Sequence, residues 1–76
     1  MKKVEIYELQ KDGSQKVIAT CRLVGENEVE CEGDPTLADR IMKKSKLYAE
    51  GGLKFLRQLK RNFKSGYLNA SDIIED

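Results

Sequence analysis

The most constraining feature of this sequence is the segment at residues 53–64, LKFLRQLKRNFK, in which apolar and basic residues recur at helical spacing. At the 100° per residue of an α-helix, four of its apolar residues fall within about 100° of one another. These are Phe55, Leu56, Leu59 and Phe63. The basic residues fall on the opposite side, and they are Lys54, Arg57, Lys60, Arg61 and Lys64. Such a helix needs an apolar surface to cover, so we expect it to pack on a sheet.

The chain length restricts how much of that surface there can be. With 76 residues, of which 39% are hydrophobic and 36% charged, the chain is long enough for one domain spanning residues 1–76. A domain of this size buries only about 60% of the surface of its unfolded chain, so its stability is marginal. We therefore expect every long apolar stretch to be needed for the core.

Two segments near the N-terminus have the pattern of strands, residues 4–9 and 16–24. Between them lies Asp12-Gly13, which favours a two-residue hairpin loop because both central positions of a type I′ turn need positive φ. This loop predicts that Val4 lies opposite Cys21, and that Ile6 lies opposite Ala19. The apolar residues of both strands then share one face.

A third strand follows at residues 29–32 after a three-residue loop at 25–27. Its predicted register places Cys21 opposite Cys31. A disulfide is one interpretation of that pair, but we favour two buried reduced thiols, because the expected location of the chain is cytoplasmic. The two cysteines have no histidine partner, so they do not indicate a zinc site.

Two helices are expected after the strands. Asp34 and Pro35 are typical of an N-cap and of the first helical position, and this helix should reach Lys44 or Ser45. The second helix, at residues 53–64, should end at Ser65-Gly66, with Gly66 as a left-handed cap.

The predicted fold is therefore a two-layer α+β domain, in which two helices cover one face of a three-stranded antiparallel meander. The edge of the first strand can pair with a strand of a partner or of a second copy of the chain, or it can be covered by residues 67–70 as a short fourth strand, and the sequence leaves both alternatives open. Residues 71–76 are expected as one frayed turn or a disordered tail. The predicted core is Val4, Ile6, Val17, Ala19, Cys21, Leu23, Val29, Cys31, Leu37, Ile41, Met42, Phe55, Leu56, Leu59 and Phe63.

Catalytic and ligand motifs are absent from the sequence. The lack of histidine excludes Ser-His-Asp and Cys-His arrangements. Gly51-Gly52 lacks the spacing of a phosphate-binding loop. We therefore expect a non-enzymatic protein with no cofactor and no metal. There is no apolar run of the roughly 20 residues that cross a membrane, and the first residues lack the apolar core of a signal peptide, so the expected location is cytoplasmic.

The basic side of the second helix offers one functional hypothesis. Nine basic residues against one acid occupy positions 40–64. Lys54, Arg57, Lys60, Arg61 and Lys64 could contact the phosphates of a nucleic acid or another polyanion. A net charge of +1 argues against a nucleic-acid binder, and a solvated helix face explains the same pattern.

Leftover apolar residues support a second hypothesis, which we favour. Strand alternation places Tyr7, Leu9 and Ile18 on the mainly polar sheet face, and Tyr67 and Leu68 lie in the C-terminal segment. These five residues are candidate contacts for a protein partner or for a second copy of the chain. The sequence therefore predicts a small accessory or regulatory subunit, or a homodimer.

Overall fold

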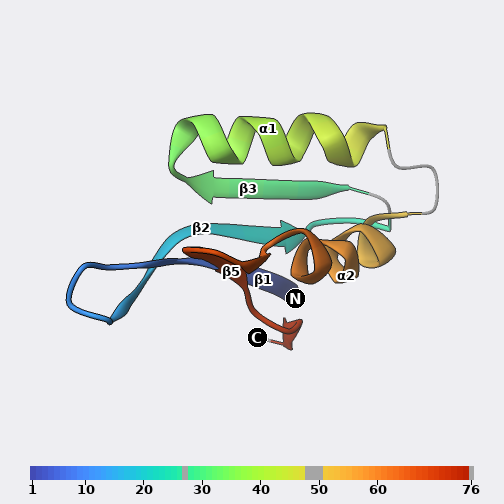
Figure 1. The fold of residues 1–76 in the computed structure, drawn as a ribbon. Coiled ribbons are helices and arrows are strands. Elements are labelled where there is room, and N and C mark those ends of the chain that lie inside the picture. The colour runs from blue at the N-terminus through green and yellow to red at the C-terminus, as the bar shows by residue number, and fades with distance from the viewer. Residues whose placement is uncertain (27, 48–50, 76) are drawn as a thin grey trace.

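A computed structural model of the chain describes residues 1–26, 28–47 and 51–75 (Figure 1). Three strands come first, and two helices and three short strands follow. They are β1 (Lys2–Leu9), β2 (Gln15–Leu23), β3 (Val29–Gly33), α1 (Pro35–Lys46), α2 (Gly52–Asn62), β4 (Lys64–Ser65), β5 (Leu68–Ala70) and β6 (Ile74–Glu75).

The strands form one antiparallel sheet in the order β3-β2-β1-β5-β4, with β6 paired to β1 beyond the end of β5. Both helices pack on the face that carries the buried residues, with α1 over β3 and β2, and α2 over β2, β1 and β5. The predicted two-layer α+β fold is thus confirmed, and the segment after α2 does supply a fourth main strand on the edge of β1.

The start of α1 is formed as its sequence predicts. The side chain of Asp34 accepts a hydrogen bond of 3.0 Å from the backbone N–H of Leu37, and Pro35 is the first helical residue. The helix ends at Lys46, slightly beyond the predicted end.

The β1–β2 hairpin differs from the prediction in its loop. The loop comprises residues 11–13, because the N–H of Gln10 donates to the carbonyl of Ser14 at 2.7 Å. Gly13 closes it with a φ of 90°, as expected for the left-handed residue of a three-residue loop. The predicted pairs Val4–Cys21 and Ile6–Ala19 are nevertheless correct, because β2 contains one extra residue, Ile18, where the register shifts.

Because of this bulge, the residues at the N-terminal end of β2 point to the faces opposite to those predicted. Tyr7 pairs with Val17 instead of Ile18, so Val17 lies on the outer face and is 41% exposed. The prediction that Val17 belongs to the core was therefore wrong. Ile18, predicted on the outer face, instead packs partly buried against the core.

The end of α2 was also predicted incorrectly. The last helical residue is Asn62, and the Phe63 N–H still donates to the carbonyl of Leu59 at 3.0 Å. The carbonyl of Phe63 then accepts from the N–H of Ala70, which draws the chain into the β4–β5 hairpin. Gly66, expected as a helix cap, has a φ of 72° and lies in the turn of that hairpin. Lys64 therefore belongs to β4 and not to the helix.

The core lies between the sheet and the helices. Of the predicted core residues, Leu23, Cys31 and Phe63 are only partly buried, and Met42 is also half-buried. Ala38 is buried, although it was missing from the predicted core. The fully buried side chains at the centre are Val4, Ile6, Cys21, Leu56 and Leu59.

Cys21 and Cys31 are joined by a disulfide, contrary to the expectation of reduced thiols. The predicted register itself is correct, since the two residues are paired across β2 and β3 with their Cα atoms 4.0 Å apart. The preference for thiols came from the expected compartment and not from the geometry.

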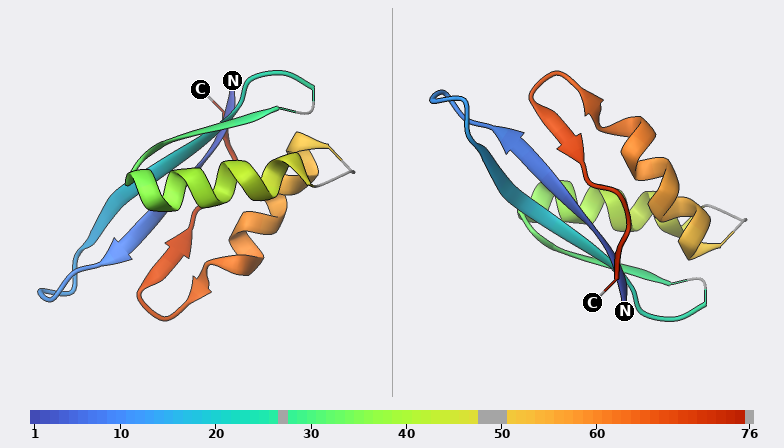
Figure 2. Two further views of the ribbon diagram at one scale, coloured as in Figure 1. Left: turned by 90° about the horizontal axis from the view of Figure 1, so that it is seen from above. Right: turned by 90° about the horizontal axis from the view of Figure 1, so that it is seen from below.

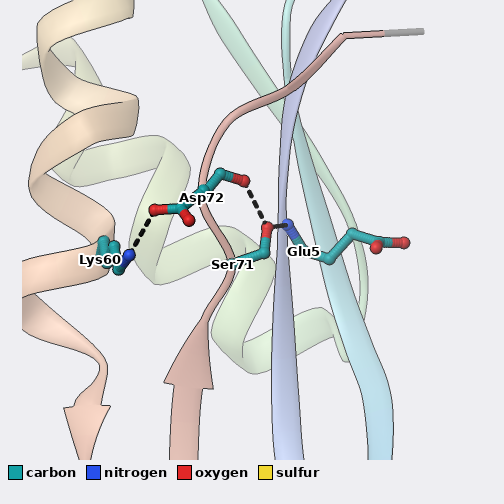
Figure 3. Close-up of polar contacts among 4 residues, drawn as sticks. All are labelled: Glu5, Lys60, Ser71 and Asp72. Carbon is teal, nitrogen blue, oxygen red and sulfur yellow. Dashed lines mark hydrogen bonds and ion pairs between the residues drawn. The ribbon is translucent and has the colours of Figure 1, made fainter.

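The C-terminal segment follows β1 along its length, which differs from the expected frayed or disordered tail. Ser71 connects β5 to β6: its N–H donates to the carbonyl of Glu5, and its hydroxyl accepts from the Glu5 N–H at 3.0 Å (Figure 3). The Lys60 ammonium forms an ion pair with the carboxylate of Asp72. These contacts attach the tail to both β1 and α2.

Candidate interaction groove

α1 and α2 lie at an angle to each other, and they separate from the end of α1 and the start of α2 onward (Figure 2). Two adjoining clefts occupy the space along α1. We call them together the interhelical groove, and its lining apolar residues are Ile18, Leu37, Ile41, Leu47, Phe55, Leu59, Phe63, Tyr67 and Leu68.

The cleft nearer the helix link has a volume of about 480 Å³. Its floor consists of Ile41 from α1 together with Phe55, Leu59 and Phe63 from α2 and its end. Leu47, at the C-cap of α1, also lines it and is 84% exposed. We call this the basic cleft, because its polar lining is Arg40, Lys43, Lys44 and Asn62, with no carboxylate among the described residues.

The second cleft, of about 320 Å³, lies between the first turns of α1 and the β4–β5 hairpin. We call it the hairpin cleft. Its apolar lining is Ile18 from the β2 bulge, Leu37 from α1, and Tyr67 and Leu68 from the hairpin. Arg40 lines both clefts, so they adjoin along one side of α1.

Three of the five predicted contact residues therefore meet in one place. Ile18, Tyr67 and Leu68 come together in the hairpin cleft, on the helix side of the sheet. Ile18 reaches this side only because of the bulge, since simple alternation had placed it on the outer face.

Tyr7 and Leu9 lie elsewhere. Tyr7 neighbours the buried Ile6 on β1 and therefore points to the outer face. Its hydroxyl donates to the carboxylate of Glu5 at 3.0 Å, and this hydrogen bond, followed by desolvation and the charge of Glu5, raises the pKa of Tyr7 above its usual value. Leu9 is exposed at the end of β1, where its N–H donates to the carbonyl of Tyr67.

Leu37 and Ile41, predicted in the core, are buried there, and Arg40 is exposed. Sequence reasoning did not show that these three residues of α1 also line the two clefts. A signal was available at Leu47, an apolar residue at the end of a helix with no partner in the predicted pattern. Arg40 and Lys44 have no ion-pair partner within residues 1–26, 28–47 and 51–75, whereas Lys43 pairs with Asp39 at 3.0 Å.

The basic residues of α2 face away from the groove. Lys54, Arg57, Lys60 and Arg61 are exposed on this helix, while Lys64 lies in β4. A separate cleft of about 480 Å³ includes Lys2, Arg57 and Lys60 in its lining. Lys2 pairs with Glu75 at 2.5 Å and Lys60 pairs with Asp72 (Figure 3), so two of these three cations are already neutralised.

The part of the chain that the structure describes contains no cluster of three or more histidine, cysteine, aspartate or glutamate side chains that could hold a metal. Its helices are too short and too polar for a membrane crossing. Besides Tyr7, Asp12 has a shifted pKa, which is lowered because the hydroxyl and N–H of Ser14 both donate to its carboxylate.

Comparison with known proteins found no matching family model, no matching curated protein and no matching solved structure. The function is therefore argued from the interhelical groove and the charges around it.

Proposed function

We propose that this protein is a non-enzymatic binding module that holds a protein partner in the interhelical groove. One observation carries the proposal: the exposed side chains of Leu47 and Tyr67 line two adjoining clefts whose remaining apolar lining comes from β2, both helices and the β4–β5 hairpin. Tyr67 remains 63% exposed and Leu47 84% exposed. A fully buried side chain of this kind contributes about 1.5–3 kcal/mol, so a partner that covers both would gain several kcal/mol before binding costs.

The other surfaces are less suited to a protein partner. The edge of β1, which the sequence left open to strand addition, is occupied by β5 and β6. On the outer face of the edge strand β3 lie Glu30 and Glu32, and Glu32 pairs with Arg22 at 2.6 Å. Charged side chains on an edge strand oppose pairing with another chain. The groove combines exposed apolar side chains, Leu47 and Tyr67, with a cleft lining that is largely apolar.

A selection from a displayed library of random peptides tests the proposal. Peptides recovered on the wild-type protein should lose binding to Leu47→Asp and to Tyr67→Asp, which alter exposed groove residues. Matched controls are Leu9→Asp and Val24→Asp, since both side chains are exposed apolar residues outside the groove.

The expected result is a loss of affinity of at least tenfold for the two groove variants and an unchanged affinity for the two controls. Recovery of no specific peptide, or of peptides that bind all four variants equally, would contradict the proposal. Circular dichroism of each variant shows whether the fold is retained.

Polyanion binding by α2 is the alternative proposal. It is supported by the exposure of Lys54, Arg57 and Arg61 on one helix. It is weakened by the ion pair of Lys60 with Asp72 and by the position of Lys64 in β4. Binding of labelled nucleic acid that weakens with a slope of several charges in log salt, and that Arg57→Glu with Arg61→Glu abolishes, would favour this alternative.

A further inference from the structure

We infer that the segment held in the interhelical groove is an acidic amphipathic helix. This inference rests on the proposed function and specifies its partner by secondary structure and by charge. It depends on three features of the groove: the strands beneath it, the spacing of its apolar residues, and the charges on its rim.

The strands beneath the groove exclude a partner that adds a strand. In the order β3-β2-β1-β5-β4, each of β2, β1 and β5 has a hydrogen-bonded neighbour on both sides. The outer strand on this side of the sheet is β4, which comprises only Lys64–Ser65 and so offers too few backbone groups for an added strand. A partner must bind through side chains, as amphipathic helices do when they insert an apolar face between other elements.

The apolar residues of the groove are spaced for such a helix. Leu37 and Ile41 lie one turn apart on the same side of α1, about 6 Å along its axis at 1.5 Å per residue, and they form the buried base of the two clefts. The exposed apolar residues beside them are Tyr67 at the hairpin cleft and Leu47 at the basic cleft. Leu37 lines the hairpin cleft and Ile41 the basic cleft, so the two clefts follow one another along α1. A partner helix with apolar residues at positions i, i+3 or i+4, and i+7 would place successive side chains in the two clefts.

The rim of the groove supplies the charge preference. Arg40, Lys43 and Lys44 line the basic cleft, and the described residues place no carboxylate there. Lys43 is paired with Asp39, which leaves Arg40 and Lys44 without a partner among the described residues. Carboxylates flanking the apolar face of a partner helix would pair with these two cations. In the hairpin cleft, by contrast, Glu8 and Asp34 are present, so the acidic residues of the partner should lie toward the basic cleft.

Nucleic acid fits this groove less well than an acidic helix. A phosphate backbone would satisfy Arg40 and Lys44, but it offers no apolar group to the exposed Leu47 and the half-buried Phe63 of the same cleft. The combination of an apolar floor with a cationic rim favours a ligand that carries both characters on one face.

Three synthetic peptides of one length test the inference by fluorescence anisotropy. The first has leucines at helical spacing flanked by glutamates, the second has the same leucines flanked by lysines, and the third is the first in scrambled order. The wild-type protein should bind the first at least tenfold more tightly than the other two, and this preference should narrow as salt is raised.

Charge reversal at the rim provides the decisive comparison. Arg40→Glu with Lys44→Glu should abolish or reverse the preference for the acidic peptide. Lys11→Glu with Lys16→Glu is the matched control, because it changes the net charge equally at exposed residues that do not line the groove. If the first pair destabilises α1, Arg40→Gln with Lys44→Gln should still reduce the preference.

The possible outcomes separate the two claims. If library peptides bind the groove but acidic and basic helices bind equally, the inference is overturned and the proposed function stands. If neither library peptides nor designed helices bind, both fail. Competition of a single-stranded oligonucleotide with the acidic peptide, lost on changing Arg40 and Lys44, would overturn the inference in favour of a nucleic-acid ligand.

Discussion

Replacement of Gly33 by alanine should destabilise the fold more than the same replacement at Gly13, Gly25 or Gly66. Gly33 is the last residue of β3, with a φ of 120°. A Cβ atom at this position would press on the carbonyl oxygen of Ile18 and would lie 2.8 Å from the Cα of Ala19. The obstruction is backbone, so it cannot turn away as a flexible side chain would. The same carbonyl of Ile18 accepts from the N–H of Asp34 at 2.8 Å, so this contact joins the bulge of β2 to the start of α1.

The magnitude follows from two contributions. A side chain forced to positive φ costs roughly 1–2 kcal/mol. Forcing extra atoms into a closely packed site typically costs about 1–3 kcal/mol more. The sum, roughly 2–5 kcal/mol, approaches the whole free energy of unfolding of a small domain, which can be about 5 kcal/mol.

Gly13→Ala is the matched control for this substitution. Gly13 also has positive φ, at 90°, but nothing lies within 4 Å of the added Cβ. Gly13→Ala therefore loses stability through the positive φ of its backbone but not through a close contact of the added Cβ. Because 1 kcal/mol shifts Tm by roughly 4–8 °C in a domain of this size, Gly33→Ala should melt at least about 5 °C below Gly13→Ala in thermal denaturation followed by circular dichroism. Equal melting temperatures would show that the close approach of β3 to the bulge is absent.

Three further predictions concern α1, the core and the outer face. Asp34→Ala should lower the free energy of unfolding, measured by urea denaturation, by about 0.5–2 kcal/mol, because it removes the N-cap hydrogen bond. Asp34→Asn should keep most of that stability, because asparagine also caps helices. An equal loss in both variants would argue against capping. Leu56→Ala should lower the free energy of unfolding by about 2–5 kcal/mol, because Leu56 is fully buried. Phe63→Ala should lower it by less than the roughly 3–5 kcal/mol of a buried phenylalanine, because Phe63 is half-buried. A larger loss for Phe63→Ala than for Leu56→Ala would place Phe63 in the core. Protonated Tyr7 donates a hydrogen bond to Glu5, so the stabilisation from this bond is present below pH 10 and is lost as the pH rises through the raised pKa of Tyr7. Tyrosinate absorbance should show Tyr7 titrating above pH 10, with its signal assigned by its loss in Tyr7→Phe. Titration of Tyr7 below pH 10 would exclude the hydrogen bond.

The sequence was sufficient for the fold class because each element has a local signal. Alternation placed the strands, and Asp34-Pro35 placed the start of α1. The pairs Val4–Cys21 and Ile6–Ala19 were correct although the loop was one residue too short in the prediction. The extra residue of the bulge restores the register that the longer loop would otherwise shift by one residue. A bulge has no sequence signal of its own, so it can be inferred only when the register is known at both ends of the strand pair.

The errors at α2 have a different physical origin. Helical periodicity continues through Phe63 and Lys64, so the local pattern favours a helix to that point. A backbone hydrogen bond from the N–H of the distant Ala70 to the carbonyl of Phe63 ends the helix earlier by drawing the chain into the β4–β5 hairpin. Competition between a local helical pattern and pairing with a later segment cannot be resolved from the pattern alone.

The candidate groove could be predicted only in part. Ile18, Tyr67 and Leu68 were identified as surplus apolar residues, which follows from composition and alternation. Their meeting point depends on the bulge of β2 and on the divergence of the helices, which are tertiary features. The role of Arg40 depends on its place beside two clefts, and no pattern in the sequence distinguishes it from other exposed basic residues.

Binding in the interhelical groove is tested most directly by titrating the ¹⁵N-labelled protein with the acidic amphipathic peptide and recording amide chemical shifts. The largest changes are expected at Ile18, Leu37, Arg40 and Leu68, with little change on the outer face of the sheet at Thr20. Changes concentrated on the exposed side of α2, or spread over the outer face, would contradict the assignment of the groove as the binding surface.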